Sequence, residues 1–177
     1  MELYHNKYRI KSARLKDWDY SNPWWYYVTI NTKYHIEYFG KIIEGKMVTN
    51  ELGKIADKCW KEIPNHFANT ELDYFVIMPN HLHGIVIMNI IPKNKNVETP
   101  DRASLHNSTL GSIVNQFKGS VKRWANRSGY SPFACQSRFY DRIIRNEKEL
   151  YNIRKYIDQN PLKWEFEKND MDNIYEL

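Results

Sequence analysis

The hydrophobic and polar positions of this chain follow two different periods, and runs of aromatic and β-branched residues mark the strands. Residues 24–31 (WWYYVTIN) predict a first, central strand. Two apolar runs, 72–78 and 81–88, are separated by the turn Pro79-Asn80 and predict an antiparallel pair. The remaining strands are expected at 34–39 and 46–49, which flank two glycines as in a small hairpin, and at 136–145.

Apolar residues spaced three and four positions apart predict three helices. The first begins after Asn50, a good N-cap residue, and stops at Pro64. The second carries an apolar stripe over 110–124, with its charged residues directed outward. The third opens at Asn146, with a glutamate three residues later as in a capping box, and we expect it to end at Asn160-Pro161.

The order of these elements is strand, helix, strand, strand, helix, strand, helix. The first six belong to an α+β, ferredoxin-like split β-α-β fold, an antiparallel sheet with helices on one face, to which the last helix is added. With 177 residues, we expect a basic N-terminal arm (1–20), one domain (21–164) and an acidic C-terminal tail (165–177). Residues 90–108 are polar, contain two prolines and predict a long loop.

Composition limits the class of protein. An apolar content of 42%, with 15% aromatic residues, is typical of a globular chain. The two cysteines, Cys59 and Cys135, are isolated, as expected for reduced thiols rather than a disulfide or a zinc finger. The N-terminus lacks the apolar segment of a signal peptide, and polar residues interrupt the most apolar stretch. We therefore expect a cytoplasmic protein with no membrane partner.

The net charge of +5 is concentrated in two segments that also carry aromatic side chains. Such segments suit a polyanion whose bases can stack, which indicates single-stranded nucleic acid. A solvated basic surface is the alternative. The candidate DNA-binding residues are Lys7, Arg9, Lys11 and Arg14 in the arm, and Lys118, Lys122, Arg123, Arg127, Arg138 and Arg145 further along.

Two histidines stand at the start of the strand 81–88. Strand side chains alternate between faces, so His81 and His83 share one face while Leu82 points into the opposite layer. Two neutral imidazoles side by side supply half of a metal site. Solvated surface histidines are the alternative.

The last helix carries a polar stripe formed by Asn152, Tyr156 and Asn160, each four residues from the next. Tyr156 is a candidate nucleophile, and Asn160 a candidate oxygen ligand to the metal held by His81 and His83. Two nitrogens and a neutral oxygen leave positions open for phosphate and water, which favours Mg²⁺ or Mn²⁺. Alternatively, Tyr156 is a packing residue and Asn160 ends the helix before a proline.

The segment 75–86 (FVIMPNHLHGIV) resembles the HUH motif (His, hydrophobic residue, His) of the REP-associated tyrosine transposases, relatives of the single-tyrosine insertion-sequence transposases. Residues 136–146 (QSRFYDRIIRN) and 156–164 (YIDQNPLKW) are similar to the C-terminal motif of that family. The helix beginning at 110 (LGSIVNQFK) also matches in type and place. In two positions the chain departs from the usual pattern, with Cys135 in place of a tryptophan and Arg142 in place of a histidine.

The resemblance implies that His81, His83 and Asn160 bind Mg²⁺ or Mn²⁺ and that Tyr156 is the catalytic nucleophile. It implies cleavage and rejoining of single-stranded DNA, at repeats that contain hairpins, through a 5′-phosphotyrosine intermediate. The protein is expected to act as a monomer or a homodimer. Lys163 and a metal-bound water are the candidate bases.

Two other functions compete with this one. A descendant of a transposase could bind structured single-stranded DNA or RNA without cutting it. A nuclease could instead use a metal-activated water, with Tyr156 only stacking on a base.

Overall fold

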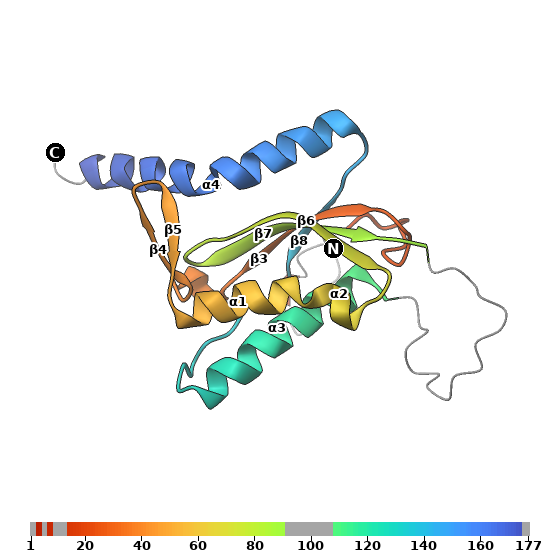
Figure 1. The fold of residues 1–177 in the computed structure, drawn as a ribbon, viewed down its shortest axis with the longest axis horizontal. Coiled ribbons are helices and arrows are strands. Elements are labelled where there is room, and N and C mark those ends of the chain that lie inside the picture. Colours follow the sequence, from red (N-terminus) through yellow and green to blue (C-terminus); the bar gives the residue numbers. More distant parts are fainter. Residues whose placement is uncertain (1–2, 5–6, 9–13, 91–107, 175–177) are drawn as a thin grey trace.

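The computed structural model describes residues 3–4, 7–8, 14–90 and 108–174 (Figure 1), with backbone alone for 3–4, 7–8 and 168–174. Its centre is a four-stranded antiparallel sheet in the order β6-β7-β3-β8. These strands are β3 (Trp25–Asn31), β6 (Thr70–Ile77), β7 (His81–Met88) and β8 (Tyr140–Ile143). Two short pairs lie apart from it: β1 (Leu3–Tyr4) with β2 (Lys7–Tyr8), and β4 (Gly40–Ile43) with β5 (Lys46–Thr49).

The connections confirm the predicted split β-α-β topology. A helix joins β3 to β6, a tight turn joins β6 to β7, and a second helix joins β7 to β8. Each crossover places its two strands parallel but not adjacent, which produces the alternating antiparallel sheet. In the register of β3 with β7, Thr29 lies opposite His83 and Ile30 opposite Leu82.

One face of the sheet is covered by α1 (Glu51–Lys61), α2 (Ile63–His66) and α3 (Leu110–Arg127), as Figure 1 shows. The predicted cap is present, since the Asn50 side chain accepts a hydrogen bond from the Gly53 amide. The core between these helices and the sheet is aromatic: the fully buried Trp60 packs edge-on against Phe117 with ring centroids 5.4 Å apart. Leu82 lies in this core, on the face predicted for it.

The opposite face of the sheet is covered by α4 (Glu147–Ile174) (Figure 1). A second, smaller cluster of buried side chains joins them: Tyr27, Ile85, Ile144 and Ile157. Because helices cover both faces, β7 is buried on both sides, which explains its nearly continuous apolar sequence. The start of α4 is capped as predicted, with Asn146 Oδ1 accepting a hydrogen bond from the Glu149 amide.

The predicted end of the last helix at Asn160-Pro161 is wrong, because α4 continues through Pro161 to Ile174. Much of the predicted acidic tail therefore belongs to this helix. A proline inside a helix removes one hydrogen bond and bends the axis, at a cost of about 3 kcal/mol or more, and Figure 1 shows a bend near the middle of α4. Packing offsets that cost: Pro161 is buried, and Leu162 lies against Gly45 at the turn of the β4-β5 hairpin.

Two predicted strands also need correction. Residues 34–39 form no strand; a 3₁₀ turn, Lys33–His35, stands there instead, with Tyr34 and His35 at positive φ (59° and 55°). The hairpin strand begins only at Gly40. The last strand is shorter than the predicted 136–145, since only Tyr140–Ile143 pair with β3.

Residues 14–20 of the predicted arm pack on the domain, where Trp18 Nε1 donates a hydrogen bond to the Tyr26 hydroxyl (3.1 Å). The predicted loop 90–108 falls almost entirely outside the described residues. Within the described part of the chain, none of the helices combines the length and apolarity that crossing a membrane requires.

Candidate active site

His81 and His83 are the first and third residues of β7, on the sheet face that α4 covers. Both are buried, with exposed fractions of 9% and 5%. Their Nε2 atoms face each other at 3.0 Å. As predicted from the alternation of strand side chains, the two rings lie on the same face of the sheet. They form one buried site rather than a solvated surface pair.

Asn80 fixes the tautomer of His81. Its side-chain oxygen lies 2.7 Å from His81 Nδ1, and its amide nitrogen donates to the His35 carbonyl (3.0 Å). An amide oxygen can only accept, so the proton of His81 is on Nδ1 and the lone pair of Nε2 points toward His83.

His83 has partners that suit either tautomer. Its Nδ1 lies 2.7 Å from the Tyr27 hydroxyl and 2.9 Å from Thr29 Oγ1. Hydroxyl groups both donate and accept, so His83 Nε2 can carry a proton for His81 or present a lone pair beside it. With the second tautomer, two ring lone pairs converge on one point, the arrangement required for two ligands of one cation.

Burial keeps both rings neutral at physiological pH. It lowers the pKa of His81 to about 4, with a smaller contribution from the neighbouring His35 ring. Burial lowers the pKa of His83 to about 3, and the neighbouring His81 adds to the effect. A histidine must be neutral to bind a metal, so both rings are prepared for that role without losing a proton.

The helix α4 brings Asn160 and Tyr156 over the two histidines. Asn160 is buried (6% exposed) and its side chain lies within reach of His81, where it slightly opposes the lowering of the His81 pKa by burial. The Tyr156 ring lies 5.2 Å from the His83 ring, and 41% of the residue remains exposed. Trp164 packs on His81 with ring centroids 5.5 Å apart. The four residues predicted to act together thus lie in one place.

The donor set fits a divalent cation with open positions. No group of three or more His, Cys, Asp or Glu side chains suited to a metal occurs in the described part of the chain. The two imidazole nitrogens and the Asn160 side-chain oxygen remain the predicted donors at this site. The third one is a neutral oxygen, which leaves the charge of a bound cation largely uncompensated and so attractive to phosphate.

Lys163 lies close to Tyr156, with its Nζ 5.9 Å from the ring centroid. Its ammonium pairs with Glu167 at 3.4 Å. In residues 14–90 and 108–167, no hydrogen bond joins Lys163 to the Tyr156 hydroxyl.

The predicted DNA-binding residues are spread over both faces of the sheet. The side chains of Lys7, Arg9 and Lys11 lie outside the described residues. Arg14 forms an ion pair with the buried Asp141 (3.5 Å), and its guanidinium lies over the Phe139 ring. Arg138 is exposed on the segment that precedes β8.

The basic side chains of α3 lie away from Tyr156. Lys122, Arg123 and Arg127 are exposed on α3, which covers the opposite face of the sheet. The predicted outward direction of Lys118 is wrong, because its Nζ donates to the backbone carbonyls of residues 136–138 (2.8–3.4 Å). Burial lowers the pKa of Lys118, and the three carbonyls replace its lost hydration.

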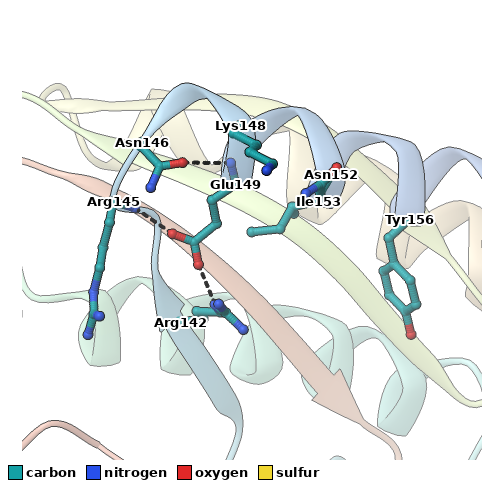
Figure 2. A pocket seen from close by; sticks show the side chains of 8 residues that line it. All are labelled: Arg142, Arg145, Asn146, Lys148, Glu149, Asn152, Ile153 and Tyr156. Carbon is teal, nitrogen blue, oxygen red and sulfur yellow. Dashed lines mark hydrogen bonds and ion pairs between the residues drawn. The ribbon is translucent and has the colours of Figure 1, made fainter.

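Among the predicted DNA-binding residues whose side chains the structure describes, Arg145 alone lines a cavity with Tyr156. This cavity, of about 530 Å³, is shown in Figure 2 and is lined by Arg142, Arg145, Asn146, Lys148, Glu149, Asn152, Ile153 and Tyr156. Glu149 lies in its middle, pairing with the Arg142 side chain and accepting from the Arg145 amide (2.8 Å). These bonds hold the pKa of Glu149 below its usual range, so it stays ionised.

Sequence reasoning missed the residues that orient the histidines, Tyr27, Thr29 and Asn80. Asn80 directly precedes His81 in the sequence, and this adjacency could have identified it as a partner of the imidazole. Tyr27 and Thr29 reach His83 through the register of β3 with β7, which the local sequence does not specify. The basic wall formed by Arg142 and Lys148 was also missed.

Comparison with known proteins gives a relative in sequence and likenesses among solved structures. No protein-family model matches the chain. A Haemophilus influenzae protein, described only as uncharacterized, is 37% identical over 163 residues, which cover 88% of this chain and 89% of that protein. A solved structure of a REP-associated tyrosine transposase bound to a REP hairpin superposes with a TM-score of 0.54 and 16% identity, covering 87% of this chain and 74% of the other. At that identity, the likeness shows a shared fold.

Proposed function

This chain belongs to the same protein family as the uncharacterized Haemophilus influenzae protein, and we propose that it is a transposase-like enzyme that cleaves and rejoins single-stranded DNA through Tyr156. One observation carries the proposal: an exposed tyrosine lies against two buried histidines whose Nε2 atoms converge, with Asn160 beside them. The transposase fold adds support, because the matching solved structure is that of a tyrosine transposase.

The roles of the residues follow from this geometry. His81, His83 and Asn160 would hold a Mg²⁺ or Mn²⁺ ion, which would supply positive charge to neutralise and polarise the scissile phosphate. Asn80, Tyr27 and Thr29 keep the imidazole rings in place and supply the hydrogen bonds that each tautomer needs.

Tyr156 is the nucleophile. Its phenolic oxygen loses its proton and attacks phosphorus, forming a bond to the 5′-phosphate while the bond from phosphorus to the 3′-oxygen breaks. The leaving 3′-oxygen takes up a proton and departs as a hydroxyl group. Because the phosphotyrosine ester retains the energy of the original linkage, a later 3′-hydroxyl can reverse the step and join new ends without ATP.

The substrate proposed is single-stranded DNA that carries hairpins. The matching solved transposase is bound to a REP hairpin, which makes a folded repeat the first substrate to try. Tyr156 is on α4, which packs on the sheet, and its ring lies 5.2 Å from that of the buried His83, so a single strand can reach it more easily than a continuous duplex.

A covalent adduct tests the proposal. The protein is incubated with a labelled library of single-stranded hairpins and Mg²⁺ or Mn²⁺, and products are separated on a denaturing gel and mapped by mass spectrometry. We expect a DNA adduct on Tyr156 that disappears in Tyr156→Phe and in His81→Ala. Tyr151→Phe is the matched control, because Tyr151 is an exposed tyrosine on the same helix, and it should keep the adduct.

Two other results would each overturn the proposal. Cleavage without an adduct indicates attack by a metal-activated water. Tight hairpin binding with neither cleavage nor adduct indicates a non-catalytic module that binds structured DNA or RNA.

A further inference from the structure

The cavity beside Tyr156 has a cationic wall that the cleavage chemistry does not use. It lies along the first turns of α4, on the N-terminal side of Tyr156 (Figure 2). Three cationic side chains line it, Arg142, Arg145 and Lys148, against one carboxylate, Glu149. The cavity therefore has an excess of positive charge and an opening to solvent through its exposed residues.

The bonds within the wall show which charges remain available. Glu149 is committed to Arg142, whose guanidinium it neutralises. Within residues 14–90 and 108–167, neither the Arg145 guanidinium nor the Lys148 ammonium takes part in a hydrogen bond or an ion pair. Arg145 and Lys148 are therefore two exposed cations on opposite sides of Glu149 (Figure 2), and each can attract a phosphate group.

The rest of the wall suits the remainder of a nucleotide. Ile153 contributes an apolar surface and Asn152 an amide, between the cations and Tyr156. A volume of about 530 Å³ lies in the range of small-molecule sites, although most of the side chains that line this cavity are charged or polar.

We propose that this cavity binds the single strand that flanks the cleaved bond, with one phosphate held by Lys148, another by Arg145, and a base resting against Ile153. The inference rests on the proposed function for the identity of the ligand, because a phosphate at Tyr156 requires the adjoining nucleotide to lie within one linkage of it. The cavity includes Tyr156 itself, so the strand enters it directly from the reacting centre. Phosphate contacts of this kind position the strand without reading its sequence.

Salt-dependent binding tests this site without requiring cleavage. The full chain is titrated into a fluorescent oligodeoxythymidine strand, in EDTA, at a series of salt concentrations. Each phosphate contact to a single strand contributes about 0.7 to the slope of log K against log salt. The Arg145→Gln/Lys148→Gln variant should therefore bind more weakly and with a slope smaller by about 1.4 than that of the native chain.

The matched control removes the same charge elsewhere. Lys54→Gln/Lys58→Gln changes two exposed lysines of α1, on the other face of the sheet, and should leave the slope unchanged. An equal loss of slope in both variants would show a general charge effect and overturn the proposal. So would an unchanged slope in Arg145→Gln/Lys148→Gln, or a native chain that does not bind the strand.

The failures of the two proposals can be told apart. If the native chain forms the Tyr156 adduct but the salt slope does not depend on Arg145 and Lys148, the enzyme function stands and the nucleotide site is wrong. If the slope depends on both cations but no adduct forms, the cavity binds the strand and the cleavage mechanism is wrong.

Discussion

Gly84 follows the two histidines in β7. Replacing it by alanine should destabilise the protein, mainly because the new methyl group would collide with the Trp60 ring. A Cβ atom at this position would lie 2.4 Å from Cζ2 of Trp60 and 3.2 Å from the Phe75 side chain. An ordinary contact needs at least 3.4 Å, so the indole or the strand must move by about 1 Å. Trp60 is fully buried and held edge-on by Phe117, so it has no open space to enter.

The expected loss of stability follows from two opposing effects. Overpacking a well-filled core costs about 1–3 kcal/mol. Alanine restricts the unfolded chain more than glycine, which returns about 0.5–1 kcal/mol. A 2.4 Å approach to a fully buried ring takes the upper part of the overpacking range, about 2–3 kcal/mol. The net loss in the free energy of unfolding is therefore about 1–2.5 kcal/mol, or about 2–10 °C in Tm for a chain of this size.

Chemical denaturation of four variants measures this contact. Gly84→Ala, Trp60→Phe and the double variant form a cycle in which the smaller ring should relieve the added methyl group, with a coupling of about 1 kcal/mol. Gly119→Ala is the control, because its Cβ would meet only the end of the Arg123 side chain in α3, and it should be neutral or stabilising. The reasoning is refuted if Gly84→Ala is as stable as the native chain, or if the cycle is additive.

Two further predictions concern the histidines. Burial lowers the pKa of His81 to about 4 and that of His83 to about 3. Below pH 6.5 these two histidines are therefore protonated in the unfolded chain but still neutral in the native state. The free energy of unfolding should therefore fall as the pH drops from about 6.5 toward 4, by up to about 1.4 kcal/mol per pH unit for each histidine. Urea titrations at several pH values should show that the stability of the His81→Gln/His83→Gln variant depends less on pH than that of the native chain. An equal pH dependence in the two proteins would contradict this prediction. Asn80→Ala should weaken Mn²⁺ binding about 10- to 100-fold in calorimetry, because His81 loses the acceptor that orients it. The control Asn89→Ala, just beyond the other end of β7, should bind Mn²⁺ as the native chain does. Native affinity in Asn80→Ala would show that Asn80 does not orient His81.

Much of the fold follows from local rules. A period of two places His81 and His83 on one face and Leu82 on the other, whatever lies around them. Asn50 and Asn146 cap their helices through side-chain bonds to amides three residues ahead. The order of strands and helices then leaves few topologies open, and the split β-α-β sheet is one of them.

The sequence by itself determined which residues could carry the chemistry, and the tertiary structure decided how they meet. Pro161 shows the limit of local rules, because the packing of α4 against the hairpin at Gly45 offsets the cost that should have ended the helix. The register of β3 with β7 sets Thr29 and Tyr27 beside His83, and the docking of α4 brings Tyr156 to within 5.2 Å of that ring. These are contacts between residues far apart in the chain, whose energies come from shared burial and not from the preferences of any one segment.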